Sequence, residues 1–238
     1  MGRGDRSPGT AHAPPAGDTS QEAGASTARF DLDTSWGPAR VDLDRPDGTP
    51  ASLLVLGHGA GGGVDAPDLL AVRDLATSVG VVVARVTQPY RVAGRRAPAP
   101  AHQLDAAWSS VVSTLVAQTG GPALVVGGRS SGARVACRTA AGLGAVGIVT
   151  LAFPLHPPGR RTGGDPALAQ ARRSRADELD TGLPTLVVNG DRDPFGIPAP
   201  APDRQVAVRP GERHDLRRDP GGVAAIVVDW LRAHGWAR

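Results

Sequence analysis

Apolar runs alternate with longer amphipathic stretches along most of the chain. Uninterrupted apolar runs predict buried strands, and apolar residues spaced three or four apart predict helices. The predicted strands cover residues 39–44, 51–57, 80–86, 122–128, 145–153, 183–190 and 204–210. The predicted helices cover residues 68–79, 102–118, 132–142 and 221–234. The strict alternation of "ARVDLD" at 39–44 predicts an edge strand.

Strands that alternate with helices indicate βαβ units, so the predicted fold class is α/β, with a mostly parallel sheet covered on both faces. Residues 1–28 are rich in Gly, Pro, Ala and Ser and predict a disordered tail, which leaves residues 29–238 as one domain. Residues 154–182 are rich in Arg, Pro and Gly and predict a cap-like insertion that roofs the site.

Four loops that follow predicted strands carry the reactive residues, and sites in parallel sheets form at the carboxyl ends of strands. The loops are "GHGAGGG" (57–63), "GGRSSG" (127–132), "NGDRDPFG" (189–196) and "GERHDL" (211–216). The second fits G-x-S-x-G with Ser130 at its centre, at the change from strand to helix, which predicts a nucleophile elbow. Centring the pattern on Ser131 would put the large Arg129 where the tight turn needs a small residue.

A serine nucleophile needs a histidine base and an orienting carboxylate, which in this architecture follow it in the order serine, acid, histidine. His214 lies in the loop after the last predicted strand, whereas His234 lies near the end of the last helix. Asp193 and Asp191 compete as the acid. Asp193 is favoured because Pro194 stiffens its backbone, while the Asp191 side chain is suited to cap a turn.

The same chemistry needs backbone N–H groups that stabilise an oxyanion. The residue after the nucleophile, Ser131, supplies one of these groups. Ala60 in the 57–63 loop is the candidate for the other, with Gly61 next. His58 precedes the serine in the chain and is interpreted as a structural residue of this loop.

In combination these strings resemble the α/β-hydrolase superfamily. More narrowly, "GHGAGGG", "QPYR" (88–91), "GGRSSGAR", "FPLHPPGR" (153–160) and "GDRDPFG" resemble a group that includes dienelactone-hydrolase-like bacterial proteins and a subunit of the nonspecific-lethal complex. The resemblance covers roughly residues 30–236 and implies a triad of Ser130, Asp193 and His214. Such proteins often have Asp before the histidine, where this chain has Arg213.

The predicted function is therefore that of a serine hydrolase that cleaves a carboxylic ester or thioester of a small molecule through an acyl-enzyme intermediate. Tyr90 and Arg160 are the candidates for binding the substrate. Other arginines in the insertion and after residue 90 are candidates for binding a substrate carboxylate or phosphate. A non-catalytic interaction module with this fold is the alternative function.

A second alternative is a dinucleotide-binding oxidoreductase, because residues 57–62 also satisfy G-x-G-x-x-G after a strand. Pro67 predicts a helix start too late to meet a pyrophosphate, and the following strand has no acid at its end to hold a ribose. Arg85 could still serve a 2′-phosphate, so this alternative remains open at the level of sequence.

Composition limits the remaining classes of function. All 26 Lys and Arg residues are Arg, which gives a pI near 10.2 at a net charge of only +3, without a basic stripe that predicts nucleic-acid binding. The lack of Lys excludes a Walker A lysine and a Schiff-base lysine. Neither a membrane span, a metal site nor a cofactor is expected. Cys137 is the single cysteine and is expected to be a buried packing residue, and the cytoplasm is the expected location.

Overall fold

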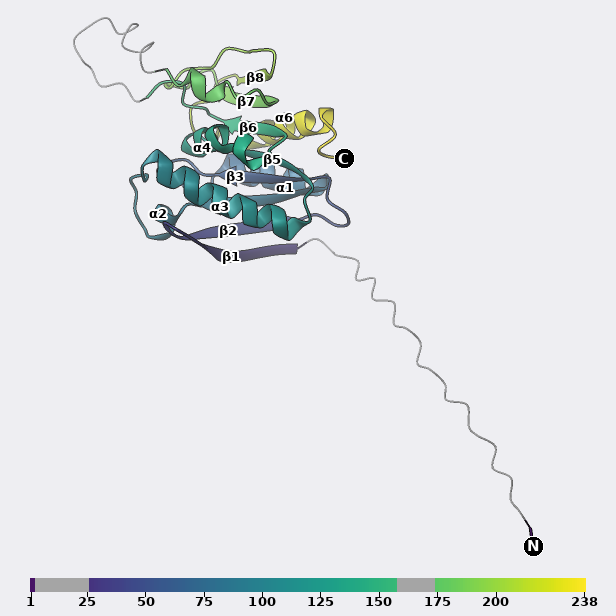
Figure 1. The fold of residues 1–238 in the computed structure, drawn as a ribbon. Helices are drawn as coiled ribbons and strands as arrows, with labels where there is room; N and C mark the ends of the chain where they lie inside the picture. Colours follow the sequence, from purple (N-terminus) through teal and green to yellow (C-terminus); the bar gives the residue numbers. More distant parts are fainter. Residues whose placement is uncertain (3–25, 158–173) are drawn as a thin grey trace, which may run out of the picture.

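The computed structural model describes residues 1–2, 26–157 and 174–238. Eight strands form one sheet in the order β1-β2-β4-β3-β5-β6-β7-β8 (Figure 1). The strands are β1 (Ser26–Thr34), β2 (Gly37–Arg45), β3 (Ser52–Gly57), β4 (Val81–Thr87), β5 (Ala123–Arg129), β6 (Gly147–Leu151), β7 (Thr185–Gly190) and β8 (Arg204–Arg209). Strands β3 to β8 run parallel to one another. Strand β2 is antiparallel to both of its neighbours, β1 and β4. The prediction of a mostly parallel sheet is confirmed.

Helices cover both faces of the sheet. The longer helices are α1 (Pro67–Ser78), α3 (Ala101–Thr119), α4 (Ser131–Thr139) and α6 (Pro220–Ala233), and the short helical segments are α2 (Pro89–Val92), η1 (Ala141–Leu143) and η2 (Ala176–Leu179). α3 and α4 pack on one face and α1 and α6 on the other, each over its own apolar cluster (Figure 1). The strands between them are uninterrupted apolar runs because both of their faces are buried.

The amino-terminal edge of the sheet differs from the prediction. β2 contains residues 39–44, which were predicted to form an edge strand, but β2 lies between β1 and β4. The edge is β1, whose first residue Ser26 pairs with Arg45, so residues 26–28 belong to the sheet and not to the predicted tail. The side chains of β1 are mostly exposed, so its burial pattern gives a weak signal in the sequence.

The described parts of the predicted insertion at 154–182 pack against the domain. Leu179 of η2 is fully buried, and Glu178 forms ion pairs with Arg134 and Arg138 of α4. Arg175 donates hydrogen bonds to the backbone of Pro154 and Leu155. Arg160, the predicted substrate-binding arginine, and Arg161, Arg172 and Arg173 lie outside the described residues.

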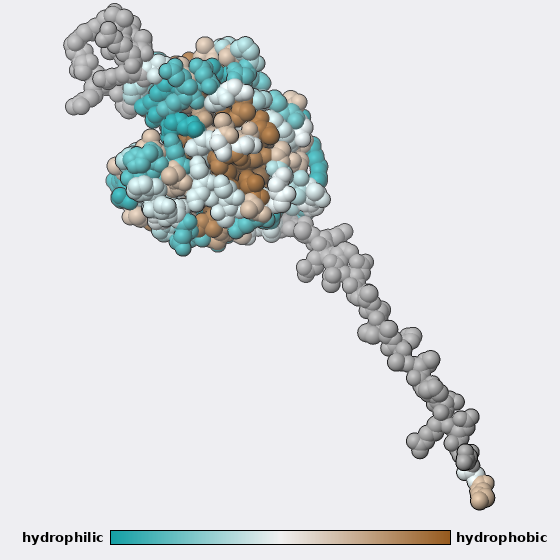
Figure 2. Space-filling model, in the orientation of Figure 1, coloured by the Kyte–Doolittle hydropathy of each residue, from teal (hydrophilic) through white to brown (hydrophobic). Residues whose placement is uncertain are grey.

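The carboxyl ends of the parallel strands lie together at the end of the sheet that carries α2, on the left in Figure 1. Strand β1 begins at the opposite end of the sheet, and the carboxyl terminus after α6 lies at that same end (Figure 1). On the viewed surface, a hydrophobic region (brown) is broken and bordered by hydrophilic side chains (teal; Figure 2). The four loops with reactive residues all follow carboxyl ends, so the fold collects them at one edge.

Candidate active site

Ser130 sits at a strained turn between β5 and α4. Its backbone has φ 53° and ψ −107°, a conformation that a residue with a Cβ rarely adopts. The turn lies tightly against the end of β3. A Cβ at Gly132 would lie 2.5 Å from the carbonyl carbon of Gly57, and a Cβ at Gly128 would lie 2.5 Å from its oxygen. Glycines on both sides of Ser130 are therefore a steric requirement of this turn.

A chain of hydrogen bonds joins Ser130, His214 and Asp193. His214 Nε2 lies 2.9 Å from Ser130 Oγ, and His214 Nδ1 lies 2.8 Å from Asp193 Oδ2. Because a carboxylate can only accept, Nδ1 carries the proton, and Nε2 of the neutral ring then accepts from the serine hydroxyl. In this arrangement the imidazole is oriented to take the proton of Ser130.

The environments of the two competing aspartates differ. The Asp193 side chain is fully buried, and its second oxygen accepts from the N–H of Phe195 at 2.9 Å. The Asn189 amide donates to Asp193 Oδ2 at 3.3 Å. Asp191 is exposed and accepts from the N–H of Gly211 at 2.7 Å. Asp193 is thus the carboxylate beside His214, and Asp191 links its loop to the loop after β8.

The loop after β3 lies close to Ser130 and is held by the side chains of Tyr90 and Arg91. A Cβ at Gly59 would lie 3.6 Å from Ser130 Cβ. The hydroxyl of Tyr90 donates to the Ala60 carbonyl at 2.8 Å, and Arg91 donates to the Gly62 carbonyl at 3.0 Å. Among the residues that the structure describes, the N–H of Ala60 has no hydrogen-bond partner.

The buried imidazole of His58 also holds this loop. Its Nε2 accepts from the Gln88 N–H at 3.1 Å, so in the neutral ring Nδ1 carries the proton and donates to the Gly59 carbonyl at 2.8 Å. His58 is 3% exposed, and burial lowers its pKa. Both ring nitrogens are occupied, which agrees with a structural role for His58.

Comparison with known proteins identifies the family. The family model described as an alpha/beta hydrolase domain matches residues 50–207, more than half of the chain. The chain belongs to the α/β-hydrolase family. Comparison with curated proteins gave no match.

Solved structures show the same α/β-hydrolase fold. A structure described as an α/β serine hydrolase without a lid, from Xanthomonas campestris, has a TM-score of 0.67 at 19% identity and covers 93% of this chain and 98% of that chain. Dienelactone hydrolase from Anabaena variabilis has a TM-score of 0.67 at 15% identity, covering 91% and 100% of the two chains. The esterase domain of a Rhodothermus marinus protein has a TM-score of 0.65 at 18% identity, covering 87% and 98%.

Arg129, next to the nucleophile candidate, links the turn at Ser130 to helix α1 and to the loop that carries His214. Its Nε lies 3.0 Å from Asp68 Oδ2 of α1. The two groups form an ion pair, but their geometry does not meet the criteria for a hydrogen bond. Its Nη2 donates to the His214 carbonyl at 3.0 Å. Asp68 has no exposed side-chain surface, and burial raises its pKa against the attraction of Arg129. In the sequence only the bulk of Arg129 is evident, because a contact with a carbonyl 85 residues away leaves no local pattern.

The side chain of Tyr90, a predicted substrate-binding residue, is bonded within the protein. The side chain is 3% exposed, and its hydroxyl is used by Ala60. Burial raises the pKa of Tyr90 to about 12, so it remains a neutral donor. Arg91 is likewise committed to the Gly62 and Arg95 carbonyls. Both residues support the loop after β3.

The features that suggested dinucleotide binding have other roles. α1 begins at Pro67, so its amino terminus does not lie within the glycines of the 57–63 loop. Arg85 is 5% exposed and binds the Val64 carbonyl at 2.9 Å and Asp44 at 3.3 Å. It is therefore used inside the protein and is not available to a 2′-phosphate.

Two further residues lie where the sequence predicts. Cys137 is buried, and burial raises the pKa of its thiol to about 12, so it is a poor nucleophile. His234 follows the last residue of α6. Its ring centroid lies 4.5 Å from that of Trp230 and 4.6 Å from that of Trp236.

Within the described ranges, no group of three or more His, Cys, Asp or Glu residues could hold a metal ion, and no helix is long and apolar enough to cross a membrane.

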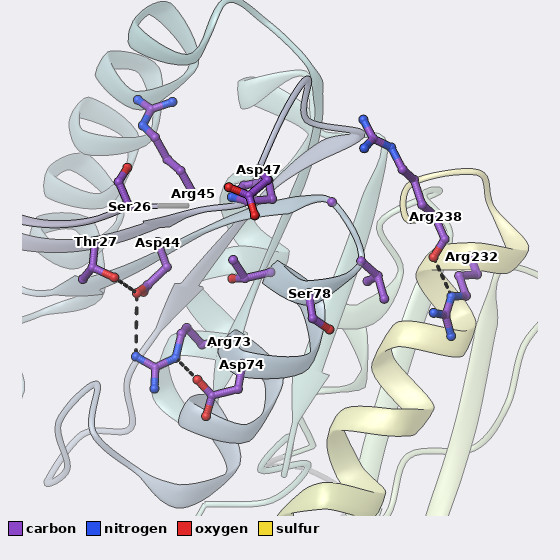
Figure 3. Close-up of a pocket in the computed structure, with 14 residues that line it drawn as sticks. Ser26, Thr27, Asp44, Arg45, Asp47, Arg73, Asp74, Ser78, Arg232 and Arg238 are labelled. Atoms are coloured by element: carbon purple, nitrogen blue, oxygen red, sulfur yellow. Dashed lines mark hydrogen bonds and ion pairs between the residues drawn. The ribbon is translucent and has the colours of Figure 1, made fainter. Parts of the chain in front are cut away.

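An open cleft of about 730 Å³ lies at the other end of the sheet from Ser130. Figure 3 shows the residues that line it. It is bordered by the end of β2, the end of α1 and the chain terminus. Arg73 lies between Asp44 and Asp74, and Arg232 donates to the backbone of Arg238 (Figure 3). These arginines are already paired within the protein, so we place the candidate site at the carboxyl end of the sheet.

Proposed function

We propose that this α/β-hydrolase is a serine hydrolase that cleaves a carboxylic ester or thioester of a small molecule through an acyl-enzyme intermediate. The observation that carries the proposal is the hydrogen-bonded chain from Ser130 through His214 to Asp193. Buried structural serines do not need a strained backbone, an aligned imidazole and a buried carboxylate at once, whereas nucleophilic catalysis needs all three.

In the proposed reaction, His214 Nε2 takes the hydroxyl proton as Ser130 Oγ attacks the carbonyl carbon. Asp193 stabilises the imidazolium that forms and keeps its orientation. The N–H groups of Ser131 and Ala60 stabilise the tetrahedral oxyanion, each contributing about 3 kcal/mol by comparison with known oxyanion holes. The imidazolium then protonates the leaving group, and water activated by His214 releases the acid.

The neighbourhood of Ser130 supports the oxyanion role of Ala60. The loop that carries this residue runs close to the Ser130 side chain, and its carbonyls at positions 59, 60 and 62 are held by His58, Tyr90 and Arg91. Fixing the carbonyls fixes the peptide planes, so the Ala60 N–H needs little reorganisation when charge develops.

Labelling with a fluorophosphonate tests the proposal. The intact protein should be labelled at Ser130 and should hydrolyse short acyl esters, and Ser130→Ala should lose both activities. Ser131→Ala is the matched control, since it retains the backbone N–H and should still be labelled. Lack of labelling and of ester turnover in the intact protein would favour the alternative, an interaction module with the hydrolase fold. Labelling that persists in Ser130→Ala would show that another residue is the nucleophile.

A further inference from the structure

Two arginines stand beside His214 at the mouth of the site. An open cleft of about 500 Å³ is lined by Arg192, Pro194, Arg213, His214 and Asp215. Arg192 and Arg213 are both exposed, and neither has an ion-pair partner among the described residues. The cleft therefore carries two cationic groups that the protein itself does not neutralise.

The backbone holds these two arginines close together. The N–H of Arg192 donates to the carbonyl of Glu212, the residue before Arg213, at 3.0 Å. Gly190 packs so tightly on the same peptide that a Cβ there would lie 2.2 Å from the Glu212 oxygen. Asp191 adds a third link through the Gly211 N–H at 2.7 Å. The backbones of Arg192 and Arg213 are thus held close together, so both side chains start from the same side of the cleft.

Nearby acids do not offset the two charges. Glu212 is buried and accepts from the N–H groups of Arg218 and Asp219, so it faces away from the cleft. Asp215 also lines the cleft as a single carboxylate against the two arginines, and its Oδ2 lies 3.7 Å from Arg217 Nε. The net charge that this cleft presents is positive.

The position of the cleft assigns it to one side of the substrate. During hydrolysis His214 Nε2 must give its proton to the leaving oxygen, so the leaving group has to lie against His214. The carbonyl oxygen points toward the oxyanion donors, on the other side of Ser130 Oγ. A cleft lined by His214 and its neighbours therefore accommodates the alcohol or thiol part of the substrate.

We propose that Arg192 and Arg213 bind a carboxylate or phosphate on the leaving group of the substrate. This inference rests on the proposed serine hydrolase function and specifies its substrate class: acyl esters or thioesters of an anionic alcohol or thiol. Arginine suits either anion because its planar guanidinium makes paired, charge-assisted hydrogen bonds.

Four acetyl or acyl esters test the inference. 4-Acetoxybenzoate and 4-acetoxyphenyl phosphate carry the charge on the leaving group, 4-acetoxybenzamide is a neutral counterpart, and monophenyl succinate carries the charge on the acyl group. The ratio of kcat/KM for each anionic leaving group to that for the benzamide should exceed 1 and should fall as salt is raised. The succinate should show no such preference. Comparing the benzoate with the phosphate distinguishes the two anions.

Variants assign the preference to the two arginines. Arg192→Ala and Arg213→Ala should each lower the anionic-to-neutral ratio about tenfold, and the double variant should lower it further. Arg218→Ala is the matched control, because this exposed arginine of the same loop does not line the cleft, and its ratio should stay unchanged. A ratio unaffected in the double variant, or lowered equally in Arg218→Ala, would overturn the inference while Ser130-dependent hydrolysis of the neutral ester still upheld the proposed function. If no ester is hydrolysed, the proposed function fails and this inference fails with it.

Discussion

Arg129 and His214 are 85 residues apart in the chain, and a 3.0 Å hydrogen bond joins the guanidinium of the first to the carbonyl of the second. The other side of the guanidinium pairs with the buried Asp68. The loop that carries the proposed base is thus anchored to α1 through the residue next to the proposed nucleophile. Anchoring of this kind limits how far His214 can drift from Ser130.

Replacing Arg129 should therefore affect both stability and catalysis. Arg129→Met should lower the free energy of unfolding by about 3 kcal/mol, because Asp68 is left buried without its partner. It should also lower kcat for an ester by roughly 10- to 100-fold, because a small displacement of a catalytic group is costly. Adding Asp68→Asn should recover part of the stability and none of kcat. Denaturant unfolding and steady-state kinetics measure the two effects, and a double variant that recovers both would contradict the positioning role.

The two aspartates of the 189–196 loop provide a matched pair of substitutions. Asp193→Asn should lower kcat by about 10⁴-fold, since an amide favours the wrong imidazole tautomer. Asp191→Asn should leave kcat within about threefold, because Asp191 is exposed and bonds the Gly211 N–H instead of His214. Steady-state rates with one neutral ester suffice for the comparison. Equal losses in the two variants would refute the assignment of Asp193 as the orienting acid.

Steric closeness at the elbow leads to a third prediction. A Cβ at Gly132 would meet the Gly57 backbone at 2.5 Å, whereas a Cβ at Gly142 meets nothing within 4 Å. Gly132→Ala should therefore lower the free energy of unfolding by about 1–3 kcal/mol through overpacking and should reduce ester hydrolysis. Gly142→Ala should be neutral or stabilising by about 0.5 kcal/mol, since it reduces the entropy of the unfolded chain. Thermal or denaturant unfolding tests both, and similar stabilities would contradict the close packing.

The order of strands and helices could be predicted from the sequence because the buried strands of a parallel sheet are continuous apolar runs. β1 was the exception. Its side chains are mostly exposed, and its stability comes from backbone pairing with β2, which leaves little apolar pattern in the sequence. For the same reason the sequence pattern indicates β2 as the edge strand.

The candidate triad could also be predicted, because chain order and strand ends restrict which Asp and His residues can meet Ser130. The roles of Tyr90 and Arg129 could not. Each acts through a backbone carbonyl that is distant in the sequence, on Ala60 and on His214 respectively. Sequence patterns report burial and local turns, whereas such contacts depend on how the loops pack in three dimensions.

The neutral state of His58 gives a pH-dependent prediction. Burial lowers its folded pKa below the unfolded value of about 6.5, so at acidic pH the unfolded chain binds a proton that the folded protein excludes. The contribution of His58 to stability is therefore complete above the unfolded pKa and is lost as the pH falls below it. Protonation of Nε2 would also break its hydrogen bond from the Gln88 N–H.

Replacing His58 with Gln removes this titration, so the free energy of unfolding should fall less between pH 7.5 and pH 5.5 in His58→Gln than in the unmodified protein. His234→Gln is the control, because His234 lies at the end of α6, and it should retain the steeper dependence. Equal pH dependence in His58→Gln and the unmodified protein would show that His58 does not stay neutral in the folded state.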